Sequence, residues 1–269
     1  MSTFWQKVRG VGVVVVAVVV VVVLLLAMPA PWNVDQEFGV TFSAPHAEGI
    51  GLNWREAYVA TLDELEVRHL RLSAYWNTVE PRDDVFTFAD LDFQMDEAAA
   101  RDVQVILAVG RKLPRWPECH TPGWAAVLPE EEQQQEVFEM LEVVVNRYKD
   151  HPALVMWQLE NEPLLDFGVC PPEDRTFLAK EEALLRSHDA SRPILITDSG
   201  ELNSWLGAAQ YGDVVGTTMY RTVFSERTEK PFRYDYIFPS WVYRLKSRYV
   251  KILRGKDVLI SELQGEPWG

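Results

Sequence analysis

Residues 154–163 read LVMWQLENEP, an apolar run that ends in Asn161 and Glu162. A short apolar run of this kind is typical of a strand buried in a parallel sheet. In a barrel of parallel strands and helices, the active site lies at the C-terminal ends of the strands. The stretch therefore predicts a buried strand that delivers an amide and a carboxyl group to the active face.

The rest of the chain shows six similar β-rich apolar runs, separated by longer segments with helical periodicity. The predicted strands cover 38–43, 69–74, 103–110, 154–159, 194–198, 214–219 and 258–261, and the clearest helices cover 54–67, 91–101, 130–149 and 175–188. The units average about 33 residues, close to the roughly 30 per unit of a (β/α)8 barrel. We therefore expect an α/β fold, a TIM-type barrel over 37–269 that lacks the eighth unit. A doubly wound open sheet is the alternative, but the first strand is followed by no GxGxxG motif and no P-loop.

A second carboxyl group, Glu262, stands at the end of the seventh strand in VLISELQ at 258–264. Glu162 and Glu262 are expected to face one another. Such a pair suits glycoside hydrolysis, in which one carboxyl group protonates the leaving oxygen and the other attacks the anomeric carbon or activates water. A negative Glu262 would raise the pKa of Glu162 and keep it protonated as the acid. Retention predicts carboxyl groups about 5 to 5.5 Å apart, and inversion about 6.5 to 9.5 Å.

Composition narrows the classes of function. The 269 residues include 26 Lys and Arg against 40 Asp and Glu, a formal charge of −14. An acidic body repels phosphates, which argues against a nucleic-acid partner and is compatible with neutral oligo- or polysaccharides. Aromatic residues make up 12%, with ten Trp, and core packing accounts for most of them. The sequence holds no metal-ligand spacing, phosphate loop or GxSxG elbow, so we expect no cofactor and no metal, and no obligate protein partner is evident.

The N-terminus has the composition of a membrane-targeting segment. Residues 11–28 are uncharged and almost wholly apolar, and they follow Lys7 and Arg9. Their number suits a spanning helix better than the shorter core of a secretory signal. We expect a cytoplasmic segment at 1–10, a transmembrane anchor or uncleaved signal at 11–28, a linker at 29–36 and an extracytoplasmic domain. Secretion after signal cleavage is the alternative.

The two cysteines, Cys119 and Cys170, are too few for a zinc site. An oxidising compartment allows them to pair, although parity and compartment alone leave two free thiols equally open. The predicted fold favours pairing, because Cys119 follows the third strand, Cys170 follows the fourth, and neighbouring loops on one face can approach each other. We predict a Cys119–Cys170 disulfide that braces the rim of the cleft.

The motif NEP at 161–163, combined with a glutamate that ends the seventh strand, resembles the clan A retaining glycoside hydrolases. The run YWNTVEP at 75–81, which continues to FTFADLD at 86–92, is also similar to cellulase-like and β-galactosidase-like branches of that clan. The resemblance extends over roughly residues 37–269. It implies a (β/α)8 barrel with an acid/base glutamate on the fourth strand and a nucleophile on the seventh.

The resemblance implies a role for each matching residue. Glu162 is the general acid/base, Glu262 is the nucleophile, and Asn161 hydrogen-bonds the sugar 2-hydroxyl. Arg71, in LRLS at 70–73, matches the arginine that supports the nucleophile, and Tyr220 matches the tyrosine that hydrogen-bonds it. The alternatives are an ordinary surface salt bridge for Arg71 and core packing for Tyr220.

Three further residues follow the second and third strands and are expected to rim the same cleft: Trp76, Trp116 and His120. Core packing is an equal alternative for both tryptophans, and a hydrogen-bonded structural role is favoured over acid/base chemistry for His120. The function expected is a membrane-anchored retaining glycosidase that acts on β-linked neutral sugars. An inactive carbohydrate-binding or structural relic of the same barrel is the alternative, and it shares every motif.

Overall fold

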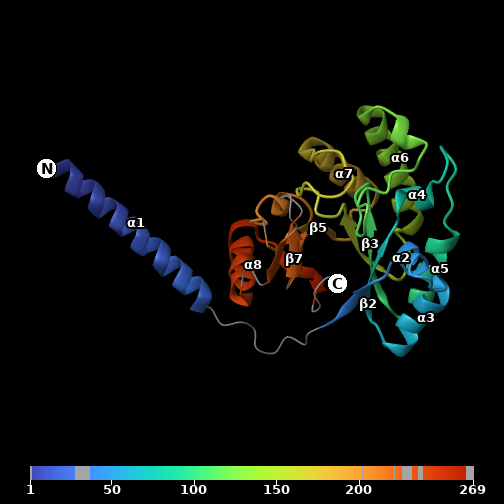
Figure 1. Cartoon of the computed structure of the whole chain (residues 1–269), viewed down its shortest axis with the longest axis horizontal. Helices are drawn as coiled ribbons and strands as arrows, with labels where there is room; N and C mark the ends of the chain where they lie inside the picture. Colours follow the sequence, from blue (N-terminus) through green and yellow to red (C-terminus); the bar gives the residue numbers. More distant parts are fainter. Residues whose placement is uncertain are drawn as a thin grey trace.

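Seven parallel strands form the main sheet of the computed structural model, which describes residues 2–27, 37–201, 203–220, 222–225, 232–235 and 239–264 (Figure 1). In their order across the sheet they are β1 (Gly39–Thr41), β2 (His69–Ser73), β3 (Gln104–Val109), β4 (Leu154–Leu159), β5 (Ile194–Asp198), β6 (Val214–Tyr220) and β9 (Asp257–Gln264). Spatial order follows chain order without the reversal that defines a doubly wound sheet. The prediction of a TIM-like parallel sheet is confirmed.

Helices cover the outside of the sheet. The longer ones are α3 (Trp54–Glu64), α5 (Ala89–Ala99), α6 (Glu130–Tyr148) and α7 (Arg175–His188), joined by the short α2 (Ala44–Gly49) and α4 (Trp76–Val79) and by 3-10 turns at Ala125–Val127 and Ala208–Gln210. Side chains cap two of them, because Asn53 accepts from the Arg55 N–H and Asp174 from those of Thr176 and Phe177. The four predicted helices are therefore confirmed, with ends that differ by up to three residues.

The segment between β6 and β9 differs from the prediction. It contains an antiparallel hairpin of β7 (Thr222–Ser225) and β8 (Phe232–Asp235), followed by α8 (Ser240–Arg254). Short strands of four residues give too few alternations to stand out in a sequence. Helix α8 ends at Gly255, whose φ of +73° is the left-handed conformation that glycine adopts without steric cost.

The sheet curls so that its two ends approach each other. β2 and β9 lie near opposite ends of the strand order, yet Arg71 Nη1 on β2 lies 2.7 Å from Glu262 Oε1 on β9. Within the described residues, no strand pairing joins β1 to β9 and no eighth parallel strand completes the sheet. The curled sheet brings the C-terminal ends of β2, β4, β6 and β9 around one space.

The main core lies between the outer face of the sheet and the helices. Leu72, Leu107 and Trp157 come from β2, β3 and β4, and they pack in one cluster with Tyr58 of α3 and Met140 of α6. On β2 and β4, Arg71 and Gln158 stand next to these apolar residues and point to the inner face, where Arg71 donates to Gln158 from one strand to the other. This alternation gives the curled sheet an apolar outside and a polar inside at the end that carries the site.

The N-terminal segment forms helix α1 (Ser2–Ala27), which projects from the rest of the chain in Figure 1. The segment expected at 11–28 is thus helical as far as Ala27, and Met28 and the expected linker at 29–36 lie outside the described residues. None of the described helices has the length and apolar character needed to cross a membrane. The expected transmembrane anchor is not supported by the structure.

Candidate active site

Arg71 contacts two of the predicted site residues, Asn161 and Glu262, and also Gln158. Its side chain is 5% exposed and donates from Nε to Gln158 Oε1 at 2.7 Å, from Nη1 to Glu262 Oε1 at 2.7 Å and from Nη2 to Asn161 Oδ1 at 2.8 Å. A planar guanidinium with fixed donor directions can fix three acceptors at once. Arg71 is therefore buried at the centre of the site, and the alternative of an ordinary surface ion pair is wrong.

Glu262 is held as a carboxylate. Burial alone would raise its pKa, but the Arg71 charge and hydrogen bond, together with the Tyr220 hydroxyl that donates to Oε2, bring the pKa of Glu262 below its ordinary value. A carboxylate that accepts from a guanidinium and a phenol is stabilised in its charged form. The chain therefore keeps an ionised carboxylate at the end of β9, as a nucleophile requires.

The pKa of Glu162 is shifted in the opposite direction. Its backbone has a φ of +44°, and its N–H donates to Thr197 Oγ1 at 2.8 Å. Burial is the main cause that raises the pKa of Glu162 to about 8, and the negative charges of Glu262, Glu118 and Asp198 add to it while Lys112 opposes it. A carboxyl group with a pKa near 8 is protonated at neutral pH and can act as a general acid.

Thr218 on β6 lies near both carboxyl groups. It is the register partner of Glu262 in the β6–β9 pairing, and its hydroxyl oxygen lies 3.5 Å from Glu162 Oε1 and 3.3 Å from Glu201 Oε2. Burial and the negative charge of Glu262 raise the pKa of Tyr220, whose hydroxyl donates to Glu262, and the charge of Glu162 adds to the shift. The structure thus brings the two predicted catalytic glutamates into one site, in which the pKa of Glu162 is raised and that of Glu262 is lowered.

Asn161 is fixed at both ends of its amide. Oδ1 accepts from Arg71, and Nδ2 donates to Glu118 Oε2 at 3.0 Å. Glu118 was missed by the sequence analysis. It is 7% exposed and lies in a loop after β3, and the only sequence signal was its place beside Cys119.

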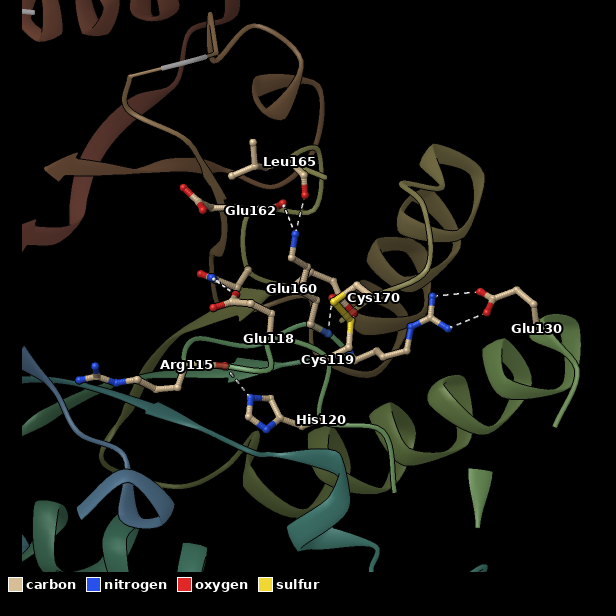
Figure 2. The surroundings of a disulfide bond; sticks show 12 residues. Arg115, Glu118, Cys119, His120, Glu130, Glu160, Glu162, Leu165 and Cys170 are labelled. Atoms are coloured by element: carbon tan, nitrogen blue, oxygen red, sulfur yellow. Dashed lines mark hydrogen bonds and ion pairs between the residues drawn. A yellow bond between two sulfur atoms is a disulfide. The ribbon is translucent and has the colours of Figure 1, made fainter. Parts of the chain in front are cut away.

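The predicted disulfide between Cys119 and Cys170 is confirmed, with the two Cα atoms 5.3 Å apart. Figure 2 shows the carboxyl groups of Glu118 and Glu162 on one side of the bridge, and Glu130 on the other. The bridge therefore joins the loop after β3 to the loop after β4 directly beside the site.

The three expected rim residues have different positions. Trp76 is fully buried in the core and donates from Nε1 to Glu80 Oε2 at 2.8 Å. Its expected place on the cleft rim is therefore wrong, because its ring has no exposed surface for a ligand. His120 is 8% exposed and binds the Arg115 carbonyl through Nε2 at 3.1 Å, so it holds the loop rather than facing outward. Trp116 is 68% exposed and packs edge-on against Phe167, and it stays a candidate for sugar contact.

One group of acids, Glu80, Asp83 and Glu136, lies close enough together to hold a metal ion. Glu80 already accepts from the Trp76 indole and the Asp84 N–H. Neither Glu162 nor Glu262 belongs to that group. The site arrangement itself needs only these side chains for acid/base and nucleophilic chemistry.

Comparison with known proteins agrees with this geometry. Residues 56–241 match the family model "Glycosyl hydrolases family 2, TIM barrel domain", a range that contains Arg71, Asn161, Glu162 and Tyr220 but not Glu262. β-Glucuronidase of Mus musculus is 33% identical over 106 residues, which are 38% of this chain and 15% of that protein.

Solved structures share the fold at low identity. GH5_18 from Streptomyces cattleya, in complex with GlcNAc, has a TM-score of 0.54 at 16% identity and covers 69% of this chain and 51% of its own. Xylanase 10B from Thermotoga petrophila, in complex with xylobiose, has a TM-score of 0.52 at 18% identity and covers 68% and 59%. In each of these matches, the shared region is less than two thirds of the relative's own length.

Proposed function

Because the chain belongs to the family of glycosyl hydrolase family 2 TIM barrel domains, we propose that it hydrolyses β-linked O-glycosides with retention of configuration. One observation carries the proposal: two glutamates in one site have different surroundings, because Arg71 Nη1 lies 2.7 Å from Glu262 Oε1 and favours a lowered pKa there, whereas burial raises the pKa of Glu162 to about 8. A protonated acid and an ionised nucleophile are the two groups that a retaining mechanism needs at its start.

The reaction follows in two steps. A Glu262 carboxylate oxygen attacks the anomeric carbon while Glu162 gives its proton to the leaving oxygen, so a glycosyl ester forms as the glycosidic bond breaks. Esterification removes the negative charge of Glu262, which lowers the pKa of Glu162. Glu162 then takes a proton from water, the water oxygen attacks the anomeric carbon, and Glu262 leaves as a carboxylate.

The substrate proposed is a neutral β-linked sugar. The net charge of −14 disfavours anionic polymers, and Asn161 keeps a second Nδ2 hydrogen for a sugar hydroxyl once Glu118 has accepted the first. Exposed Trp116 supplies a ring on which a sugar can stack. A β-glucuronide belongs among the test substrates, because the relatives matched in sequence are named for that sugar.

The experiment is hydrolysis of aryl β-glycosides of the gluco, galacto, manno, xylo and glucurono series by the purified full chain, with Glu262→Ala as control. Added azide gives the sharper result. It should attack from the empty nucleophile side in Glu262→Ala and give an α-glycosyl azide, whereas in Glu162→Ala it should replace water and give a β-glycosyl azide. Hydrolysis that survives Glu262→Ala contradicts the assignment, and a folded chain silent on the whole panel favours the inactive relic.

We also propose that the domain is extracytoplasmic and that residues 11–28 anchor it, with signal cleavage as the alternative. The disulfide supports an oxidising compartment, and Lys7 and Arg9 before the apolar run support a cytoplasmic N-terminus. Alkaline extraction of membranes tests the anchor: the chain should remain in the pellet. Its appearance in the soluble fraction at full length contradicts anchoring.

A further inference from the structure

Building on the proposed function, we propose that Glu118 is a positioning residue for the reaction. Its carboxylate fixes the amide of Asn161 so that one N–H faces the substrate, and the Cys119–Cys170 bridge holds Glu118 in place. Asn161 is the residue through which Glu118 acts.

The hydrogen bonds at Asn161 allow one amide orientation. Oδ1 accepts from Arg71 Nη2 at 2.8 Å, and Nδ2 donates to Glu118 Oε2 at 3.0 Å. A flipped amide would set its carbonyl against the carboxylate and its NH2 against the guanidinium. With the orientation fixed, the second Nδ2 hydrogen is left to bind a sugar hydroxyl. Without Glu118, only the Oδ1 end of the amide stays tethered.

Glu118 is directed at Asn161 rather than at a cation. The Lys112 ammonium acts on Glu118 through its charge, but it donates its hydrogen bonds to the carbonyl oxygens of Glu162 at 3.1 Å and Leu165 at 2.6 Å. Among the described residues, Asn161 is the group that donates a side-chain hydrogen bond to the Glu118 carboxylate. Burying a carboxylate that has a single amide partner costs desolvation free energy, which favours a functional role for Glu118.

The loop around Glu118 is built to hold its side chain in that direction. Glu118 has a φ of +71°, and its N–H donates to the Arg115 carbonyl while its carbonyl accepts from Leu113 N–H, both at 2.8 Å. A non-glycine residue keeps such a conformation only where its surroundings determine it. The β3 loop thus presents Glu118 through a tight turn.

The loop after β4 closes over the same residue. The Val169 N–H donates to the Pro117 carbonyl at 2.9 Å, and a Cβ added at Gly168 would lie 2.6 Å from Glu118 Cβ. The disulfide joins the residues next to these contacts, Cys119 and Cys170 (Figure 2). Asn161 and Glu162 lie near the start of the β4 loop. The bridge therefore connects the loop that carries Glu118 to the loop that carries Asn161, the residue whose amide Glu118 orients.

The first test compares Glu118→Ala with Glu118→Gln in the full chain. The alanine variant loses the acceptor, so kcat should fall by roughly ten- to a hundredfold with a smaller change in KM, since bonds to the reacting sugar strengthen in the transition state. The glutamine variant keeps an acceptor oxygen and should retain kcat within about threefold. It removes a negative charge that faces Glu162, so the basic limb of its pH profile should move to lower pH.

Glu130→Ala is the matched control. Glu130 lies on the other side of the bridge, where it pairs with Arg111 at 3.0 Å, and its replacement should leave kcat and both pH limbs unchanged. Thermal unfolding of each variant confirms folding at the assay temperature. If Glu118→Ala does not fold, Glu118→Gln still gives a test, since a folded glutamine variant that keeps the acceptor oxygen but loses kcat by far more than threefold overturns the positioning role of Glu118.

The second test asks whether the bridge acts through Glu118. The double variant Cys119→Ser, Cys170→Ser should lose kcat at a temperature well below its unfolding transition. Adding Glu118→Ala to it should lower kcat much less than it does in the bridged chain, because coupled residues are not additive. Fully additive losses overturn this half of the proposal.

The outcomes separate this role from the proposed function. A folded wild type that hydrolyses no glycoside overturns the function and the role of Glu118 with it. An active wild type, inactive as Glu262→Ala but with full kcat as Glu118→Ala, overturns only the role of Glu118.

Discussion

The end of β4 and the end of β9 each present one glutamate to the same site, with opposite results. Burial pushes the pKa of both carboxyl groups upward. At β9, the Arg71 guanidinium touches the Glu262 carboxylate itself, 2.7 Å away, and reverses the effect. At β4, the Lys112 ammonium donates to the carbonyl oxygens of Glu162 and Leu165, so the carboxyl group keeps its raised pKa.

The difference shows that the atom which a cation contacts matters more than whether a cation is present. A charge-assisted hydrogen bond stabilises the carboxylate directly, whereas a cation bound to the backbone acts only through a longer Coulomb interaction. One residue type thereby supplies an acid and a nucleophile in a single site. Substitutions at Glu162, Arg71 and Tyr220 each remove one side of this comparison.

The largest expected effect is on protonation of the leaving group. Glu162→Gln removes the acidic proton, so kcat/KM for alkyl or disaccharide β-glycosides should fall by about 10²- to 10⁴-fold, the usual contribution of a general acid. For dinitrophenyl β-glycosides, whose leaving group needs no proton, the first step should be nearly unchanged. Steady-state and burst kinetics on the two substrate classes measure this contrast.

The wild type provides the control, because its dependence on leaving-group acidity should be shallow and that of Glu162→Gln steep. Equal losses on both substrate classes would contradict the acid role of Glu162 and point to a misplaced sugar instead.

The next effect concerns the cation at β9. Arg71→Met removes the donor to Gln158 Oε1, the shortest hydrogen bond to Asn161 Oδ1 and the cation that contacts Glu262, so the free energy of unfolding should fall by about 3 to 5 kcal/mol. The acid limb of kcat/KM should move to higher pH, because burial then dominates the pKa of Glu262. Urea denaturation and the pH profile measure the two effects.

Arg55→Met is the matched control for Arg71. Arg55 pairs with Asp90, and the two side chains are 48% and 50% exposed, so the loss should stay below about 1 kcal/mol. Similar losses of unfolding free energy in the two variants would mean that the buried contacts of Arg71 stabilise the fold no more than an exposed ion pair does.

The sequence was sufficient to predict which strand ends carry the main residues of this site. Apolar strands that end in Asn161–Glu162 and in Glu262 could be placed on one face because parallel strands share a C-terminal edge. The Cys119–Cys170 pair could be predicted for the same reason, since loops after adjacent strands are neighbours. These features depend on strand order and periodicity, which a single sequence records.

Other features depend on side-chain direction, which no periodicity records. Trp76 follows β2 as a rim residue would, yet its indole turns inward to Glu80. Glu118 reaches Asn161 only because its backbone adopts a positive φ inside a bridged loop. The hairpin β7–β8 was missed because its strands are too short to show an alternating pattern.

A smaller effect appears in stability, with opposite signs at the two glutamates. The pKa of Glu162 in the folded chain, about 8, lies above its value near 4.5 in the unfolded chain. The contribution of this group to the free energy of unfolding is therefore lost as pH rises between the two values. Glu162→Gln should therefore stabilise the fold at pH 8 by about 1 to 3 kcal/mol and leave it unchanged at pH 4. Urea denaturation at both pH values measures the difference.

Glu262→Gln should do the reverse. The lowered pKa of Glu262 contributes stability above about pH 4.5 that is lost as pH falls through the folded pKa, so the variant should be less stable than wild type at neutral pH. Two variants that shift stability in the same direction at pH 8 would contradict the opposite tuning of the two carboxyl groups.

The smallest effect separates the two supports of Glu262. Tyr220→Phe removes the phenol that donates to Oε2 and leaves the Arg71 contact to Oε1 intact. One hydrogen bond is a weaker stabiliser than a contacting guanidinium, so kcat/KM should fall only about three- to tenfold and the acid limb should move up by less than in Arg71→Met. Because both variants act on the same carboxylate, the pH profiles of the two rank its supports: a larger upward shift in Tyr220→Phe would show that the phenol, and not the cation, keeps the end of β9 different from the end of β4.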